Sequence, residues 1–469
     1  MLSPFEAAAH VAALEPLGLD DVGSPRWMRQ SASLEQLKMQ ACADAMSKHD
    51  EFVVDELVGA GKVGVLVHQL LVLEAWRDHV LPVIADDLPE LSSMKAYMLV
   101  GRRTRMHCPA DPDVSQLYQE TTVLSVLQIL FYHRNAVDSV ADLLLELTDY
   151  CHRRLTALNA GVARTAPDLT EIRAYENVGD RVRRQAAGIA FALASDAVSL
   201  LRFITDQVDQ LPLGLVNRMV NQQGRTQTRA HGRLAGYRHG HGPVYTTPQR
   251  REGRCPCGRL DTGLYSEGAS AGQVEKFTDQ QWKVVERGES QTLTRLEGNL
   301  WIALCNLMTS ARAQQTYEVN DTRKSTIMKL RRFFNEVVVD QLPVLEPLWR
   351  MVEQLAIVDA NPMLSATPSS LLVEQVAEIR QRLLANDFQA IARKQLGTVF
   401  RPDNNLRQEL GAFANLFDSM PESTEETCGS CGKPAENRCS ACKRVWFCSR
   451  RCQLDAWPEH KLMCHPPGK

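Results

Sequence analysis

The chain has 469 residues, 44% of them hydrophobic, and a formal net charge of −3, which is the composition of an ordinary soluble globular protein. Its length allows two to four domains or one long helical array. No stretch approaches the roughly 20 apolar residues that span a bilayer, and Met1–Asp20 has neither the basic start nor the apolar core of a signal peptide. We therefore expect a cytosolic or nuclear protein, without a transmembrane segment, whose thiols are reduced.

Helical periodicity dominates the chain from about Ser33 to Met420, because apolar residues recur there at intervals of three and four. Strand-like alternation is confined to a short pair, Val274–Phe277 and Trp282–Val285. Pro212 is expected to end the helix that precedes it. The predicted helices cover residues 34–47, 52–58, 63–84, 115–133, 140–155, 189–211, 293–308, 327–342 and 371–397.

The predicted fold is mainly α. Successive amphipathic helices joined by short loops favour a helical-repeat-like body of armadillo or HEAT type, or an irregular helical array. The helices follow no fixed sequence period, which leaves both forms open. A small two-zinc finger is expected after this body. The predicted organisation is an N-terminal segment 1–32, a first part of the body 33–222, an atypical stretch 223–273, a second part 274–420 and the finger 428–464.

Residues 224–272 differ from the sequence around them. They contain ten glycines and eight arginines and lack Ile, Met, Phe and Trp. One interpretation is a disordered linker, and another is an Arg/Gly-rich RNA-binding segment with three tyrosines for stacking. The interpretation that we favour is a reading-frame or splice error that replaces a helical stretch, since GC-rich coding sequence read out of frame is rich in arginine and glycine. Sequencing the transcript across codons 220–275 tests it.

Eight potential metal ligands are concentrated near the C-terminus, including seven of the thirteen cysteines. A segment this short buries too little apolar surface to fold alone, and bound Zn²⁺ can supply the missing free energy. Four thiolate or imidazole ligands per ion close a structural site and leave no position open for catalysis. A disulfide framework is disfavoured in a reducing compartment. The ligands are Cys428-x2-Cys431, Cys439-x2-Cys442, Cys448-x3-Cys452 and His460-x3-Cys464.

The spacing permits two ways of dividing these ligands between two ions. Sequential pairing gives the first four cysteines one ion and the last four ligands the other, and interleaved pairing alternates the ligand pairs. The whole ligand series resembles that of MYND-type zinc fingers, and this resemblance implies the interleaved arrangement. Zinc 1 is then held by Cys428, Cys431, Cys448 and Cys452, and zinc 2 by Cys439, Cys442, His460 and Cys464.

The finger is expected to bind peptide rather than nucleic acid. Its charged side chains leave an excess of five positive charges, but seven thiolates and two Zn²⁺ reduce this to about two, too little for a strong phosphate-binding surface. The resemblance to MYND fingers that bind proline-containing peptides implies a groove formed by Ser440, Gln453 and Trp457. An indole beside an amide suits an extended proline-rich ligand. The alternative is that Trp457 is a core residue of a small domain.

We expect no enzymatic activity. MYND fingers often accompany a SET methyltransferase domain, but the cofactor-binding and catalytic segments of that domain are not found in the sequence. The run Gly59–Val63 superficially resembles a phosphate loop, yet it lacks the first glycine and the Ser/Thr of that motif. Lys62 is therefore interpreted as a solvated residue in a turn between helices. A divergent methyltransferase is accordingly disfavoured.

Several segments of the helical body resemble those of MYND-containing assembly factors for axonemal dynein arms: Leu37–Asp44, Asp149–Leu155, Leu201–Asp206, Trp301–Leu307 and Asp340–Pro343. The resemblance implies a cytoplasmic adaptor or co-chaperone-like scaffold that preassembles inner and outer dynein arms for motile cilia. It further implies a location at centriolar satellites or dynein assembly particles. The implied partners are a leucine-rich-repeat dynein assembly factor, an FKBP-type co-chaperone, heat-shock chaperones and dynein chains as clients. The alternative is a transcriptional co-regulator whose finger recruits proline-containing partners.

Overall fold

The structure is a computed structural model of the chain. It describes residues 2–47, 50–86, 119–160, 178–223, 274–278, 281–285, 292–316, 321–357, 376–400, 437–439 and 446–463. The atypical stretch 224–272 lies outside the described residues. The chain divides into two compact units, Met1–Ala414 and Asn415–Lys469, and each is described by itself.

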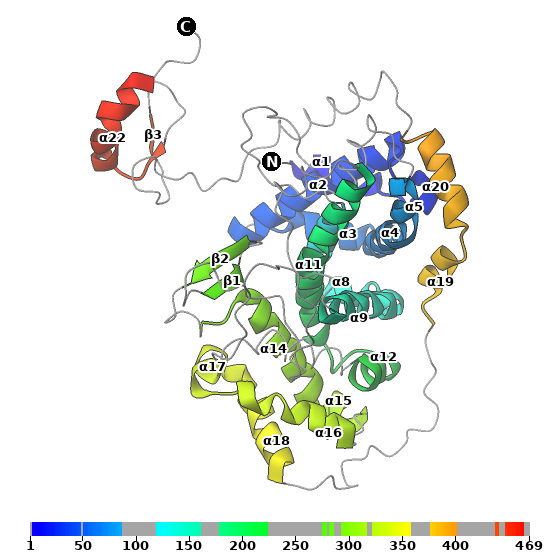
Figure 1. The fold of residues 1–469 in the computed structure, drawn as a ribbon, viewed down its shortest axis with the longest axis vertical. Helices are drawn as coiled ribbons and strands as arrows, with labels where there is room; N and C mark the ends of the chain where they lie inside the picture. The colour runs from blue at the N-terminus through cyan, green and yellow to red at the C-terminus, as the bar shows by residue number, and fades with distance from the viewer. Residues whose placement is uncertain are drawn as a thin grey trace, which may run out of the picture. The chain divides into compact units, whose positions relative to one another are not determined.

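The larger unit is mainly α, as predicted (Figure 1). Its first half consists of helices that correspond to the apolar periodicity of the sequence. In chain order they are α1 (Pro4–Ala12), α2 (Pro25–Ser47), α3 (Phe52–Gly59), α4 (Val63–Ala75), the π-helical turn η2 (Trp76–Val80), α5 (Leu81–Asp86), α7 (Gln119–Phe131), α8 (Arg134–Asp138), α9 (Leu144–Ala160), α11 (Val178–Thr205), α12 (Leu213–Asn217) and the π-helical turn η5 (Arg218–Gln223).

In the residues that the structure describes, the second half of this unit has shorter helices and a hairpin. The hairpin joins β1 (Val274–Thr278) and β2 (Gln281–Val285) in antiparallel register, with Val274 opposite Val285, which confirms the predicted strand pair. The helices are α14 (Arg295–Thr309), α15 (Ala311–Thr316), α16 (Asp321–Met328), α17 (Glu336–Gln341), α18 (Glu346–Ile357), α19 (Glu378–Leu384) and α20 (Phe388–Gly397), with 3₁₀ turns η8 (Arg331–Phe333) and η9 (Pro343–Leu345).

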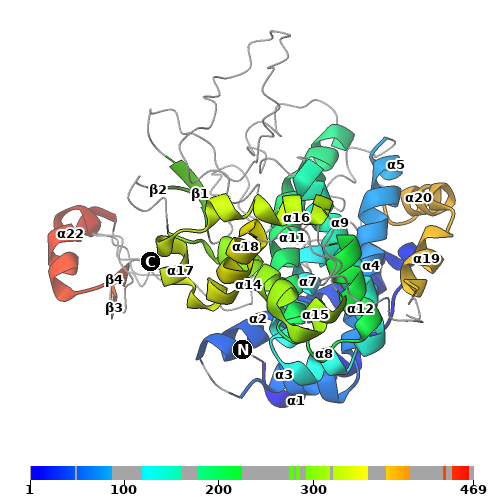
Figure 2. The ribbon, with the colours of Figure 1, turned by 90° about the horizontal axis from the view of Figure 1, so that it is seen from below.

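The long helix α11 lies at the centre of the larger unit and packs against α5, α7, α9 and α14 (Figures 1 and 2). Leu193, Leu200 and Ile204 of α11 are fully buried, because their spacing places them on one face of the helix. The main hydrophobic core extends from α1 to α20 around this face. Residues far apart in the sequence therefore share one core.

Helix α14 joins the main core to a second one. Leu300 and Leu307 face the main core, whereas Trp301 and Leu304 pack with α16, α17 and α18 in the second core. The helix begins with a capping box: Glu297 N–H donates to Thr294 Oγ1 at 3.2 Å, and Thr294 N–H donates to the Glu297 carboxylate at 2.8 Å. A helix apolar on two sides can bury both.

Three helix predictions need correction. The helix predicted over 189–211 ends at Thr205, and Pro212 is the N-cap of α12 rather than the end of that helix. The segment 327–342 is interrupted between α16 and α17, where the Asn335 side chain accepts the Val338 N–H and starts a new helix. The segment 371–397 is likewise divided, because Asp387 caps the start of α20 by accepting the Ala390 N–H.

The run Gly59–Val63 forms the turn between α3 and α4, as expected. Gly61 has a φ of 65°, which a residue without a Cβ adopts at low cost. Lys62 is half-exposed in this turn, and its Nζ also donates to the carbonyl oxygens of Ala12 at 3.3 Å and Leu14 at 2.9 Å. The lysine thus satisfies carbonyl groups at the end of α1.

Among the described residues, no single helix is long and apolar enough to cross a membrane. One pair, Phe52–Gly59 with Val63–Asp86, passes a test of length and composition when taken together, but its two parts are bent by 89°. The apolar side chains of this pair, including Val67, Leu70 and Ile84, are buried in the main core. Core packing accounts for their hydrophobicity.

Helices α19 and α20 return to the N-terminal half and lie beside α4 and α5 in both views (Figures 1 and 2). Gln395 is 1% exposed and links three segments. Its Oε1 accepts the Trp76 Nε1–H at 2.8 Å, and its Nε2 donates to the Leu19 carbonyl at 2.8 Å. Phe388 stacks on His79 with ring centroids 4.7 Å apart. We call α19 and α20 the clasp.

Candidate functional site

The described residues of the finger unit, 437–439 and 446–463, form a two-stranded ladder followed by a helix. Strand β3 (Asn437–Arg438) pairs antiparallel with β4 (Trp446–Phe447), and α22 (Arg450–Met463) follows. Ser449 starts this helix: its Oγ accepts the Cys452 N–H at 3.3 Å, and its carbonyl accepts the Gln453 N–H at 3.1 Å. The cap places Cys452 in the first turn of α22.

Three of the eight predicted zinc ligands have described side chains. Cys439 follows β3 and is 1% exposed, while Cys448 follows β4 and Cys452 lies on α22. The sulfur atoms of Cys448 and Cys452 are 3.6 Å apart. Two thiolates at about 2.3 Å from a tetrahedral Zn²⁺ have sulfurs about 3.8 Å apart, so this pair fits one zinc ion. His460 lies on α22, but its side chain, like Cys428, Cys431, Cys442 and Cys464, is outside the described residues.

Both proposed pairings assign Cys448 and Cys452 to the same ion, so their distance does not choose between them. Within the described part of the chain, no group of three or more His, Cys, Asp or Glu side chains could hold a metal. The interleaved ligand sets therefore stay a prediction. The zinc, when bound, would supply folding free energy to the finger. The core that its described residues form is small: Cys439 and Phe447, with Cys448, Cys452 and Ala456 packed against them.

Replacing Cys448 by histidine distinguishes the two pairings. Either pairing gives one site with four sulfurs and one with three sulfurs and a nitrogen. In the interleaved arrangement Cys448→His converts the four-sulfur site to three sulfurs and a nitrogen, whereas in the sequential arrangement the other site gains a second nitrogen. We expect ¹¹³Cd NMR of the cadmium-loaded variant to show two sites of similar shift. One unchanged four-sulfur resonance contradicts the interleaved arrangement.

The predicted peptide residues on the finger helix are at or near the surface. Trp457 is 38% exposed, and Gln453 is half-buried one turn earlier on α22. The exposure of the indole disfavours the alternative that Trp457 serves only as a core residue. Ser440 lies outside the described residues. The groove formed by Ser440, Gln453 and Trp457 remains a prediction, with two of its members placed on one helix.

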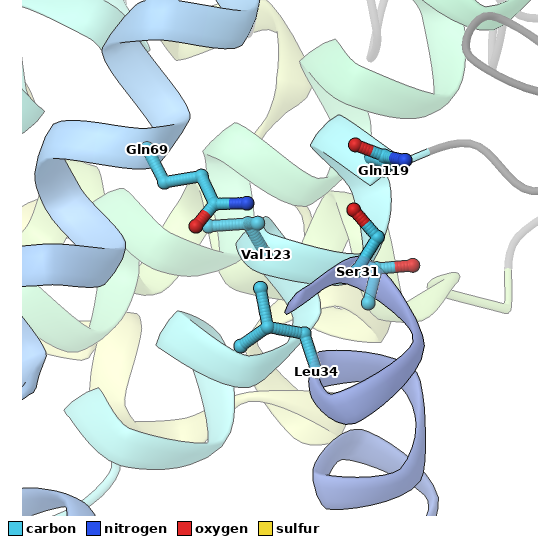
Figure 3. Close-up of a pocket in the computed structure, with 6 residues that line it drawn as sticks. Ser31, Leu34, Gln69, Gln119 and Val123 are labelled. Carbon is cyan, nitrogen blue, oxygen red and sulfur yellow. The ribbon is translucent and has the colours of Figure 1, made fainter. Parts of the chain in front are cut away.

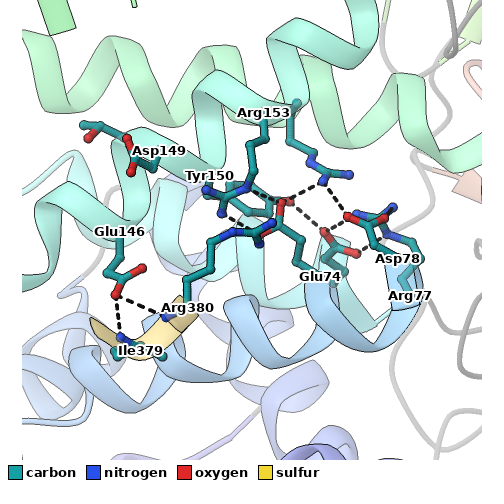
Figure 4. Close-up of polar contacts among 12 residues, drawn as sticks. Glu74, Arg77, Asp78, Glu146, Asp149, Tyr150, Arg153, Ile379 and Arg380 are labelled. Carbon is teal, nitrogen blue, oxygen red and sulfur yellow. Dashed lines mark hydrogen bonds and ion pairs between the residues drawn. The ribbon is translucent and has the colours of Figure 1, made fainter. Parts of the chain in front are cut away.

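A buried ion network in the helical body was not foreseen from the sequence (Figure 4). Glu74 of α4 is fully buried and accepts hydrogen bonds from guanidinium groups of two other segments. Arg153 Nε donates at 2.9 Å, Arg154 Nη2 at 2.7 Å and Arg380 Nη1 at 3.1 Å. One carboxylate thus connects α4, α9 and the clasp. The sequence feature that could have predicted the network is Glu74 itself. It lies within the apolar run from Leu70 to Trp76, and a buried carboxylate is almost always paired.

The charge of Glu74 depends on these arginines. Burial by itself raises the pKa of a carboxyl, but the Arg153 hydrogen bond and the charges of Arg154 and Arg380 lower the pKa of Glu74 to about 2. A second carboxylate fixes the clasp: Glu146 Oε1 accepts the backbone N–H of Ile379 at 2.7 Å. These contacts lie at the start of α19. We interpret the network as a structural tie.

The network continues toward α7 through a third buried carboxylate, Glu120. Arg77 Nε donates to Glu120 Oε2 at 2.8 Å, and the Tyr150 hydroxyl donates to Glu120 Oε1 at 2.9 Å. Asp78 accepts a hydrogen bond from Arg154 at 3.1 Å. Charges of both signs are thus interleaved through the interior, which is how buried ions become tolerable.

A small cavity lined by both polar and apolar side chains lies between α2, α4 and α7 (Figure 3). It has room for about one water molecule, so a small-molecule substrate does not fit. Gln69 is fully buried there, and its Nε2 has no protein hydrogen-bond partner. Ser31 and Gln119 line the same space. The cavity suits a buried structural water rather than a ligand.

Comparison with known proteins places the finger in a family. The model of the MYND finger family matches residues 428–464. The MYND-type zinc finger protein MUB1 of Saccharomyces cerevisiae is 48% identical over 44 residues, 8% of this chain and 7% of that protein. Tudor domain-containing protein 1 of Mus musculus is 40% identical over 52 residues, 11% of this chain and 4% of that protein. No solved structure matches the chain.

The similarity to a further relative extends over the helical body as well as the finger. The zinc finger MYND domain-containing protein 10 homolog of Drosophila melanogaster is 24% identical over 495 residues, which cover 98% of each chain. The similarity therefore includes the order of the two units: a long helical body followed by the finger. The chain carries a MYND zinc finger at residues 428–464 and is similar over 98% of its length to the zinc finger MYND domain-containing protein 10 homolog of Drosophila melanogaster.

Proposed function

We propose that the chain is a non-catalytic adaptor, with features of a co-chaperone, for the cytoplasmic preassembly of inner and outer axonemal dynein arms. The observation that carries this proposal is the 98% coverage of both chains in the comparison with the zinc finger MYND domain-containing protein 10 homolog. The matches to Tudor domain-containing protein 1 and to MUB1 extend over only 52 and 44 residues. A shared body and finger favour a shared role over mere possession of the same module.

In this proposal the helical body and the finger bind different partners. The body offers long helical surfaces for a client or co-chaperone, and its interior contains the buried ion network around Glu74. The finger is proposed as the protein-interaction module, because Trp457 and Leu454 expose apolar surface on α22. Proposed partners are the leucine-rich-repeat assembly factor, the FKBP-type co-chaperone, heat-shock chaperones and dynein chains.

Affinity purification from cells with motile cilia tests this role. The full chain, carrying a tag at its N-terminus, should recover dynein heavy chains together with chaperones from the cytoplasmic fraction. Recovery of chromatin factors without dynein chains would instead support the transcriptional co-regulator. Immunofluorescence at centriolar satellites and cytoplasmic particles tests the proposed location in the same cells.

Trp457→Ala should weaken partner capture while leaving the zinc content intact. The indole is 38% exposed and follows Gln453 by one turn, so its removal deletes contact surface without deleting a predicted metal ligand. We expect capture to fall about tenfold, equivalent to roughly 1.4 kcal/mol. Quantitative pull-down and metal analysis measure the two properties. Arg451→Ala on the same helix serves as control, and undiminished capture by Trp457→Ala would end the groove proposal.

A further inference from the structure

One face of α22 carries two apolar side chains between two cationic ones. Arg450, Leu454, Trp457 and Lys461 follow one another at intervals of four, three and four residues. In an α-helix of 3.6 residues per turn these intervals keep all four on one side. We call this set the finger stripe. It places two apolar side chains at the centre and a cation at each end.

All four side chains of the stripe are accessible. Leu454 is 64% and Trp457 38% exposed, and Arg450 and Lys461 are exposed as well. The packed face of α22 lies on the opposite side, where Cys452 and Ala456 contact Phe447 and Cys439. Among the described residues of the finger, the stripe lies outside this packed face, and its apolar centre is at the surface, where another molecule can contact it.

The spacing of the stripe limits the size of an occupant. Arg450 and Lys461 are separated by eleven residues of helix, a distance of about 16 Å at roughly 1.5 Å per residue. An extended peptide covers this distance with about five residues. A peptide with apolar residues in the middle and carboxylates at both ends would match the stripe in position and in charge.

We propose that the finger stripe binds an extended peptide whose short apolar core is flanked on both sides by acidic residues. This inference rests on the proposed role of the finger as an interaction module and adds the charge of its ligand. Arg450 and Lys461 attract the two acidic ends, and Leu454 and Trp457 contact the core. Charge at the ends supplies selectivity and a faster encounter, while the apolar centre supplies most of the affinity.

Charge-reversal variants and matched peptides test the proposal on the full chain. The probe is a fluorescein-labelled peptide with the sequence Glu-Glu-Pro-Leu-Pro-Glu-Glu, and its control carries glutamine in place of every glutamate. We expect the acidic peptide to bind about tenfold more tightly in 50 mM salt, with the difference shrinking at 500 mM as the charges are screened. Fluorescence anisotropy measures both affinities.

The double variant Arg450→Glu with Lys461→Glu should lose the preference, so that the acidic peptide binds about tenfold more weakly and the glutamine peptide changes less than threefold. Arg451→Glu is the matched control: this residue is exposed on the same helix but lies about a quarter turn from the stripe. It should change either affinity less than threefold. Zinc content verifies that every variant retains a folded finger.

The outcomes separate this inference from the proposed function. Equal binding of the two peptides, both weakened by Trp457→Ala, overturns the acidic-ligand inference and leaves the finger as an interaction module. No binding of the acidic peptide at about 1 mM also overturns the inference, while the recovery of dynein chains from ciliated cells still decides the adaptor role. Displacement of the peptide by a ten-nucleotide single-stranded DNA at equal concentration would show a general anion site and likewise overturn it.

Discussion

Glu74→Gln should destabilise the helical body by about 3–5 kcal/mol, the usual cost of removing one partner from a buried ion pair. The carboxylate is fully buried and accepts hydrogen bonds from Arg153, Arg154 and Arg380. An amide keeps the shape of the side chain but removes the charge that compensates three guanidiniums. Urea unfolding followed by tryptophan fluorescence measures the loss, because Trp27 and Trp76 are buried in the same core.

The loss of stability caused by Glu74→Gln should become smaller as the pH falls. The pKa of Glu74 is lowered from 4.5 to about 2 in the folded chain. A lowered pKa means that the ionised carboxylate stabilises the fold above about pH 5, and that this stabilisation disappears as the pH falls toward 2. A shift of this size corresponds to about 3 kcal/mol. The stability difference between the native chain and Glu74→Gln should therefore shrink from pH 7 to pH 3.

Glu336→Gln provides the control for both measurements. Glu336 is exposed in the first turn of α17, so its neutralisation should cost less than about 1 kcal/mol. Equal losses for Glu74→Gln and Glu336→Gln would show that the network does not stabilise the body. A difference that stays constant down to pH 3 would contradict the lowered pKa of Glu74.

Loss of the ion network should affect the attachment of the clasp as well as the contact between α4 and α9. Arg380 belongs to α19, yet it pairs with a carboxylate 306 positions earlier in the chain. Glu146 and Gln395 attach the same two helices at further points. Weakening the network should therefore detach the clasp from the N-terminal half at a lower urea concentration than the one that unfolds α11. The buried side chains of α11 belong to the apolar main core.

The sequence was sufficient for features that depend on local spacing. Most helices follow from the apolar period, and the hairpin follows from the alternation in two short segments. The break between α16 and α17 could not be found in this way. Ile327, Leu330, Phe334 and Val338 keep helical spacing and are all buried in the second core, so the pattern stays periodic where the backbone does not. Only the cap formed by Asn335 marks the interruption.

The zinc finger could be predicted from local spacing, whereas the buried ion network could not. Ligand spacing near the C-terminus indicated a zinc finger, because pairs of ligands three or four positions apart can bind the same metal ion from one short segment. The ion network gave no comparable pattern, since its partners come from three distant segments. The exposure of Leu454 and Trp457 also depended on the structure: spacing places them on one face, but only packing shows which face is covered.

Cys439→Ala should remove zinc and unfold the finger while leaving the helical body folded. Cys439 is 1% exposed and lies in the small core of the finger, and apparent zinc binding in such domains contributes about 10–16 kcal/mol to folding. We expect at least one predicted zinc to be lost. Trypsin should then cleave α22 rapidly at Arg450 and Arg451, while the urea midpoint of the body stays unchanged because the finger belongs to a separate unit.

Cys42→Ala in the body is the matched control, because this half-buried cysteine lies on α2, far in sequence from the finger. It should retain full zinc content and a protected α22. A chelator added to the native chain should reproduce the effect of Cys439→Ala, with cleavage confined to the finger. Full zinc content in Cys439→Ala would show that this cysteine is not a ligand. Simultaneous unfolding of the body would show that the two units depend on each other for stability.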